Sequence, residues 1–67
     1  MIKKLAELAK EEKVILDYCI SHDNFMTIYV FGNKFEDFLT IHPLSSYSDD
    51  EIIEITKDVI RRTKNDI

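Results

Sequence analysis

The sequence predicts an α+β fold with two layers in the order α-β-β-β-α, in which a three-stranded antiparallel meander has both helices packed on one sheet face. Apolar residues recur with a helical period near both ends of the chain, and they alternate with a period of two in the middle. Turn-forming residues separate these segments. Because 67 residues are too few for two hydrophobic cores, we expect residues 1–67 to form a single domain.

Residues 2–12 have the pattern of a short amphipathic helix. Their apolar side chains fall on one side at helical spacing, and lysines and glutamates fall on the other. A helix of this length is marginal in water by itself, so we expect packing to stabilise it. The apolar side consists of Ile2, Leu5, Ala6, Leu8 and Ala9.

Three strands are predicted in the middle of the chain, at residues 14–21, 25–31 and 35–42. These ranges are rich in β-branched and aromatic residues with a period of two. His22-Asp23-Asn24 is expected to form a three-residue loop, because Asp and Asn tolerate left-handed backbone geometry. Gly32-Asn33 is expected to form a two-residue turn in which the glycine supplies a positive φ.

The two turns fix the registers and therefore the two faces of the sheet. The first aligns Tyr18 with Ile28, and the second aligns Ile28 with Asp37. We expect both helices to cover an aliphatic face on which Asp37 is the one charge. The apolar residues of that face are Val14, Leu16, Tyr18, Ile20, Met26, Ile28, Val30, Phe35, Leu39 and Ile41. The other face carries Ile15, Asp17, Cys19, Phe25, Thr27, Tyr29, Phe31, Lys34, Glu36, Phe38 and Thr40.

The final segment has the features of a helix that begins after Ser48. Ser48-Asp49-Asp50-Glu51 fits a capping box, in which the Ser48 and Glu51 side chains each bind the other residue's amide. Acids cluster in the first turn and bases in the last, which matches the helix dipole. The apolar stripe consists of Ile52, Ile53, Ile55, Thr56, Val59 and Ile60.

The composition excludes several classes of protein. The net charge is -4 and the bases are mixed with acids, so we expect no direct binding to nucleic acid. We expect no membrane association, because no apolar run approaches the roughly 20 residues that span a bilayer, and we see no signal peptide. One cysteine cannot form a disulfide framework, and we expect a cytoplasmic location.

The residues that could support chemistry are poorly placed for it. Cys19 and His22 have a C-x-x-H spacing, but strand residues three apart face opposite sides of a sheet. Cys19 and His42 could not meet as nucleophile and base, because the second strand lies between them. Glu36 and Asp37 are adjacent and also face opposite ways. We therefore expect no enzyme activity, no cofactor and no metal site.

The aromatic face is the first candidate for partner binding. Its rings beside scattered charges are too apolar for an ordinary solvated sheet face, and exposed patches of this kind mark interfaces. The alternative is that some rings fold under a helix or that the sheet curls around them. The candidate contact residues are Phe25, Tyr29, Phe31, Glu36 and Phe38.

The acids of the last helix are a second candidate surface. They stabilise a helix start by roughly 0.3–1 kcal/mol each, which is one interpretation of their position. The other is an acidic surface that docks on a basic partner and imitates the spacing of phosphates. The candidate residues are Asp49, Asp50, Glu51, Glu54 and Asp58.

The first strand lies at an edge of the meander and carries one charge, Asp17. An edge of this kind can pair with a strand of another chain. We therefore expect Ile15, Asp17 and Cys19 to be the contacts if two copies join their sheets into a homodimer.

The α-β-β-β-α layout resembles that of double-stranded-RNA-binding domains. That family opens its last helix with a lysine-rich stretch that binds phosphates, whereas Ser48-Asp49-Asp50-Glu51 has the opposite charge here. The layout thus carries over and the activity does not. The same order with an acidic surface is also similar, in topology, to some small phage-encoded inhibitors of host defence nucleases.

These observations together lead to one functional expectation. The protein is expected to be a small non-enzymatic module that binds another protein with a basic surface, as an inhibitor or regulator. A phage or mobile-element inhibitor of a nucleic-acid-handling protein, acting in the host cytoplasm, is the narrower version. The alternative is a module that binds a nucleotide or other small molecule on Tyr29, Phe31 and Phe38.

Overall fold

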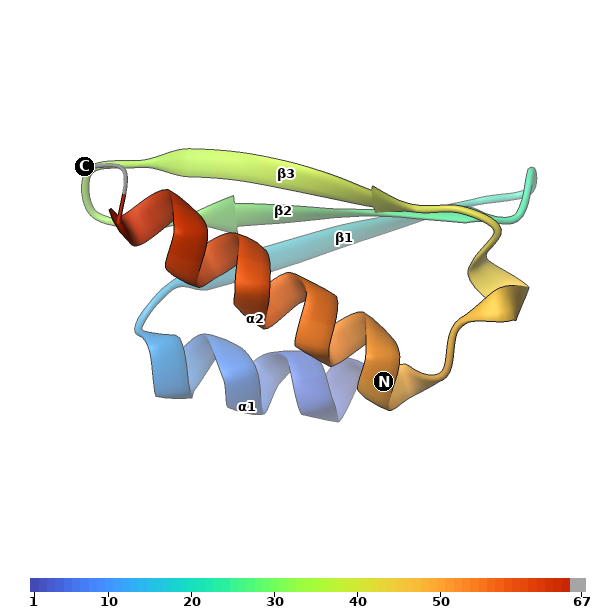
Figure 1. Ribbon diagram of the computed structural model, residues 1–67, viewed down its shortest axis with the longest axis horizontal. Helices are drawn as coiled ribbons and strands as arrows, with labels where there is room; N and C mark the ends of the chain where they lie inside the picture. Colours follow the sequence, from blue (N-terminus) through green and yellow to red (C-terminus); the bar gives the residue numbers. More distant parts are fainter. Residues whose placement is uncertain (66–67) are drawn as a thin grey trace.

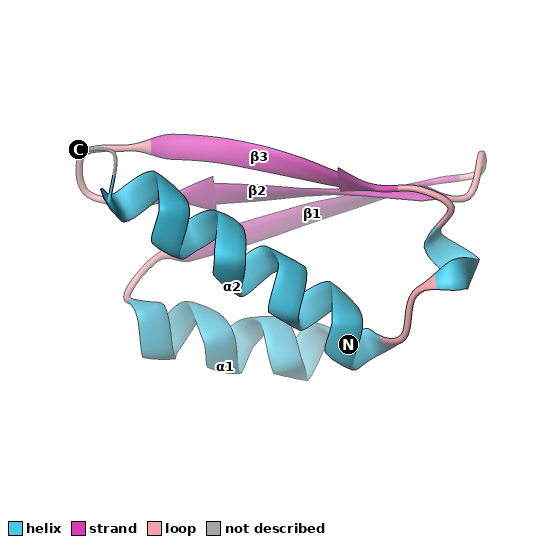
Figure 2. Ribbon diagram, viewed as in Figure 1, coloured by secondary structure: helices cyan, strands magenta, loops and turns pink. Residues whose placement is uncertain are grey.

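A computed structural model describes residues 1–65 and confirms the predicted α-β-β-β-α order (Figure 1). The strands form one antiparallel sheet in the order β1-β2-β3, and both helices lie on the same side of it (Figure 2). None of the described helices is long and apolar enough to cross a membrane. The elements are α1 (Ile2–Glu12), β1 (Ile15–Ser21), β2 (Phe25–Phe31), β3 (Glu36–Ile41), the 3-10 turn η1 (Leu44–Ser46) and α2 (Asp49–Asn65).

The helix boundaries follow from local hydrogen bonds. α1 ends where Lys13 adopts a left-handed conformation with φ 58°, and the amide of Val14 donates to the Ala9 carbonyl at 3.0 Å. The predicted capping box of α2 is confirmed. The amide of Glu51 donates to Ser48 Oγ at 3.2 Å, and the Ser48 amide donates to Glu51 Oε1 at 3.0 Å.

The first hairpin has the predicted register. Tyr18 pairs with Ile28 across a three-residue loop, and Asn24 in that loop has a φ of 66°. Asparagine tolerates this left-handed conformation better than most residues do. β1 begins at Ile15, one residue later than predicted, because Val14 belongs to the connection from α1.

The second hairpin has a register two residues away from the predicted one. Ile28 pairs with Leu39 and not with Asp37, and β3 covers Glu36–Ile41, which is shorter than the predicted 35–42. A shift of two residues leaves each side chain on its predicted face, since faces alternate with a period of two. The predicted alignment was therefore wrong, while the predicted faces were right.

Gly32 explains this shift. Its amide donates to the Phe35 carbonyl at 2.9 Å, so Asn33 and Lys34 form the turn. The φ of Gly32 is not positive, and the predicted reason for a glycine was wrong. A Cβ at this position would overlap the ring of Phe35, which packs over the Gly32 backbone. Close approach, rather than backbone conformation, requires the glycine.

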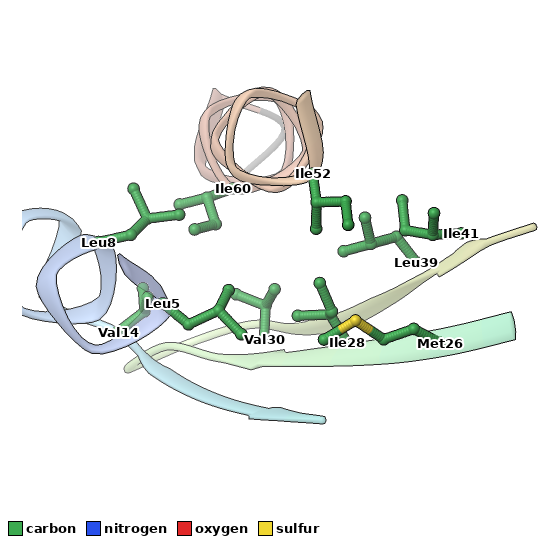
Figure 3. Close-up of a cluster of buried hydrophobic side chains, with 10 residues drawn as sticks. All are labelled: Leu5, Leu8, Val14, Met26, Ile28, Val30, Leu39, Ile41, Ile52 and Ile60. Carbon is green, nitrogen blue, oxygen red and sulfur yellow. The ribbon is translucent and has the colours of Figure 1, made fainter. Parts of the chain in front are cut away.

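The hydrophobic core fills the space between the helices and the inner face, which is the sheet face on the helix side. Figure 3 shows its side chains converging from α1, α2 and the sheet. Thr56 of α2 is also buried, and its hydroxyl donates to the Ile52 carbonyl at 2.8 Å. The core consists of Leu5, Leu8, Val14, Met26, Ile28, Val30, Leu39, Ile41, Ile52 and Ile60.

Two residues of β1 that were expected in the core are exposed. Tyr18 and Ile20 retain 36% and 58% of their accessible surface. The uncovered part of the inner face is its β1 edge, because Met26, the partner of Ile20 on β2, is only 1% exposed. Strand periodicity assigned these side chains to the correct face but could not give the reach of the helices.

Asp37, the one charged residue of the inner face, connects the sheet to α2. Its Oδ2 accepts a hydrogen bond from the Thr63 hydroxyl at 2.7 Å, and its Oδ1 accepts from the Phe38 amide at 2.8 Å. These bonds, that from Thr63 first, and the nearby charge of Arg62 hold the pKa of Asp37 below its ordinary value. An ionised carboxylate is thereby accommodated at the border of the core.

Candidate protein-interaction surface

The outer face, which is the sheet face turned away from both helices, is the candidate site. Side chains alternate along β2, so the buried Ile28 and Val30 face the helices while Tyr29 and Phe31 face outward. Cross-strand pairing arranges the outer face in rows across the three strands. From the Gly32 end these rows are Ile15-Phe31-Glu36, Asp17-Tyr29-Phe38 and Cys19-Thr27-Thr40, followed by the pair Ser21-Phe25.

The first two rows form an aromatic platform of Ile15, Tyr29, Phe31 and Phe38. Their exposed fractions are 69%, 39%, 39% and 63%, respectively. The Tyr29 and Phe38 rings lie with centroids 6.5 Å apart and planes tilted by 39°. Large apolar side chains that are neighbours on one sheet face and remain this exposed are typical of an interaction surface.

Phe25 does not belong to this platform. It lies at the opposite end of the outer face, half-buried, with its ring edge-on to His42 at a centroid distance of 6.4 Å. Thr27, Thr40 and the exposed Cys19 separate it from the platform. Three of the four predicted contact rings are therefore brought together, and the fourth lies apart.

A shallow open depression lies on the β3 side of the platform. The rings of Tyr29, Phe31 and Phe38 line it together with Glu36 and Asp37. Glu36 is opposite Phe31 in the sheet register, so its exposed side chain lies beside the rings on the outer face. The depression thus combines aromatic surface with a carboxylate.

The carboxylates of the outer face have no counter-ions within the described chain. Asp17 is opposite Tyr29 on the β1 side of the platform, and Glu36 flanks it on the β3 side. Among residues 1–65, neither forms an ion pair with a basic group. The platform is therefore framed by two uncompensated negative charges.

Four of the five candidate acids of α2 differ from these two, because each of the four pairs with a basic group of residues 1–65. Asp49 pairs with the amino group of Met1, the N-cap of α1, at 3.5 Å, and Asp50 pairs with Lys4 of α1 at 2.7 Å. Within α2, Glu54 pairs with Lys57 at 3.7 Å and Asp58 pairs with Arg62. Glu51 accepts a hydrogen bond from the Ser48 amide.

The electrostatic state of the α2 acids reflects these partners. The hydrogen bond from Lys4 lowers the pKa of Asp50, and the same bond raises the pKa of Lys4. The Ser48 amide, followed by its hydroxyl, lowers the pKa of Glu51.

α2 lies on the inner side of the sheet, so these acids and the platform do not form one surface (Figure 2).

Both open edges of the sheet carry an aspartate that binds an edge amide. Asp17 Oδ1 accepts from the Tyr18 amide at 2.8 Å, and Asp37 Oδ1 accepts from the Phe38 amide at 2.8 Å. The Gly32 amide donates to the Phe35 carbonyl, so these two residues form a hydrogen-bonded pair of the β2–β3 ladder. Hydrogen-bonded and non-hydrogen-bonded pairs alternate along an antiparallel ladder. The amides of Tyr18 and Phe38 therefore point away from β2, towards the open edges. In each case the carboxylate occupies a donor that an added strand would use.

The residues predicted to pair at the β1 edge do not direct their backbone groups towards that edge. Alternation directs the backbone groups of Ile15, Asp17 and Cys19 towards β2, whereas those of Leu16 and Tyr18 face the open edge. The edge aspartates were missed in the sequence. A signal was present, since each outer strand contains an Asp directly followed by an aromatic residue.

No group of three His, Cys, Asp or Glu side chains in residues 1–65 is arranged to hold a metal ion. β2 lies between the strand of Cys19 and the strand that leads to His42, as the meander predicts.

Comparison of the chain with known protein families, with curated proteins and with solved structures finds no match.

Proposed function

We propose that this protein is a small non-enzymatic module that binds another protein through its outer face and acts as an inhibitor or regulator of that partner. The observation that carries the proposal is the aromatic platform, whose rings are exposed on a sheet face free of helices in residues 1–65. Aromatic side chains supply most of the affinity at many protein interfaces. A core of rings within a charged border also matches the usual anatomy of an interface.

The proposed partner has a basic surface. Asp17 and Glu36 border the platform and are not neutralised within residues 1–65, so a positive partner surface complements them. The proposal does not extend to imitation of nucleic-acid phosphates by α2, because the acids there are engaged with the protein's own groups. It includes a cytoplasmic location, which an exposed free thiol at Cys19 favours.

Cys19 makes a direct test available. It is the protein's one cysteine, it is exposed, and it lies on the outer face next to the platform. A photoreactive maleimide on Cys19 should cross-link a partner in a lysate of the source cells. Alanine substitution of both Tyr29 and Phe38 should abolish that product without unfolding the protein.

The control places the same label on the helix side. In a Cys19→Ser background, Lys10→Cys carries the maleimide on the exposed surface of α1. We expect the cross-linked product from Cys19 and not from position 10. Equal products from both positions, or a product that survives loss of both rings, would contradict binding through the outer face.

A further inference from the structure

We infer that the depression on the β3 side of the platform seats an arginine side chain of the partner protein. This inference rests on the proposed function and specifies the chemical group that is recognised. Tyr29, Phe31 and Phe38 provide the ring surface of the depression, and Glu36 provides its exposed carboxylate.

Aromatic rings and a carboxylate together favour a cation. The face of an aromatic ring carries negative electrostatic potential, so a cation placed over it is attracted. Glu36 adds a full negative charge on the same face of the sheet, opposite Phe31 in the register. A positive group in the depression therefore gains from both kinds of contact at once.

The charge distribution selects this site over the others. The acids at the start of α2 already bind Met1, Lys4 or Ser48, and a partner cation would have to displace those groups. Glu36 forms no ion pair with any basic group in the described part of the chain. An incoming cation therefore displaces no ion pair of Glu36 within residues 1–65.

The shape of the site favours arginine over lysine. A guanidinium is planar, stacks on aromatic faces and binds a carboxylate through two parallel hydrogen bonds. An ammonium group is compact and more strongly hydrated, so it gains less from an open aromatic surface. The platform also offers apolar contacts at Ile15 and Phe38 for residues that flank the arginine.

The test uses three acetylated peptides of the form Gly-Leu-X-Leu-Gly, in which X is arginine, lysine or citrulline. Citrulline has nearly the shape of arginine without its charge. Each peptide is titrated into the 15N-labelled full-length protein and followed by NMR. We expect the arginine peptide to shift the amide signals of Phe31, Glu36 and Phe38, and to bind about fivefold more tightly than the citrulline peptide.

Two variants separate the contributions. Glu36→Gln removes the charge and should eliminate most of the preference for arginine over citrulline. Phe38→Leu keeps apolar volume but removes a ring face, and it should reduce the same preference. Glu11→Gln is the matched control, because Glu11 is an exposed α1 carboxylate far from the outer face, and its loss should change nothing.

Equal affinity for the arginine and citrulline peptides, tighter binding of the lysine peptide, or shifts confined to α2 would overturn the inference. Its failure can be distinguished from failure of the proposed function. If the Cys19 cross-link forms while the arginine preference is absent, the outer face binds a partner through other groups. If the cross-link also fails, the interface itself is refuted.

Discussion

The carboxylate of Asp17 accepts a hydrogen bond from the amide of Tyr18, a donor on the open edge of β1. Asp37 and Phe38 repeat the arrangement on β3, with the same 2.8 Å distance. Unpaired edge amides can recruit strands of other chains, and natural sheets commonly carry devices that prevent this. Each aspartate therefore occupies one edge donor that an added strand would use, while the association surface that we propose is the outer face.

The first prediction is that Asp17→Ala increases self-association. Its removal frees the Tyr18 amide on a strand whose neighbouring side chains, Ile15 and Ile20, are exposed and apolar. Light scattering over a range of protein concentrations should give a mass that rises more steeply for the variant than for the parent. Asp17→Asn is the control, because its amide oxygen can still accept the bond. Indistinguishable masses for Asp17→Ala and Asp17→Asn would argue against edge protection.

The second prediction concerns the packing of Phe35 over Gly32. Gly32→Ala should lower the free energy of unfolding by about 1–3 kcal/mol, because the added methyl group overlaps the ring. In a Phe35→Ala background the same substitution should cost little. Urea unfolding of the two single variants and the double variant forms a double-mutant cycle, and additive losses would show that the two positions are not coupled.

The third prediction is a loss of stability in acid. The pKa values of Asp37, Asp50 and Glu51 are lowered in the folded protein, so folding favours their ionised forms. Their contribution is complete above the ordinary values of 3.8 for Asp and 4.5 for Glu, and it is lost as the pH falls through the lower folded values. The urea midpoint should therefore stay level from neutral pH to about pH 5 and then decrease.

Glu51→Gln tests the part of this effect that arises at the α2 start. Glutamine preserves the capping-box geometry but does not titrate, so the variant should lose less stability between pH 5 and pH 3 than the parent protein. Identical acid profiles for the two proteins would exclude Glu51 as a contributor.

The fourth prediction contrasts the core with the outer face. Ile60 is fully buried, and Ile60→Ala should cost about 2–5 kcal/mol, which approaches the whole stability expected of a domain this small. Phe38 is 63% exposed, so Phe38→Ala should leave the fold intact. Thermal unfolding followed by circular dichroism compares them, and an unfolded Phe38→Ala protein would show that the platform is structural.

The fifth prediction concerns the capping box itself. Ser48→Ala removes the acceptor for the Glu51 amide and should lower the free energy of unfolding by about 1 kcal/mol. Ser46→Ala is a nearby control, because Ser46 is exposed and lies outside α2. The two variants can be compared by urea unfolding, and an equal loss at positions 46 and 48 would contradict the importance of the cap.

The sequence was informative where a local pattern determines the structure. The capping box at Ser48 and Glu51 involves residues three apart, and the left-handed Asn24 lies within its own loop, so both could be predicted. The second hairpin could not be aligned, because its register depends on the Phe35 ring packing over Gly32, a contact that composition does not encode.

The sequence predicted which side chains lie on the outer face, but it could not predict which carboxylates form ion pairs. Alternation identified the outer-face residues Tyr29, Phe31 and Phe38, since face assignment needs only the strand period. It could not show that Lys4 neutralises Asp50, because these residues are 46 positions apart and meet only through the packing of α1 beside α2. The distinction between engaged and uncompensated carboxylates therefore required the structure.

The two carboxylate oxygens of Asp37 accept hydrogen bonds from different elements. One oxygen accepts from the Phe38 amide on the β3 edge, and the other accepts from the Thr63 hydroxyl near the end of α2. Asp17 has no such second attachment to a helix within residues 1–65. A strand added at β3 would therefore compete with Asp37 for the Phe38 amide, and Asp37 is also the side chain that holds Thr63 of α2. At the β1 edge the same competition would involve Asp17, which binds the Tyr18 amide.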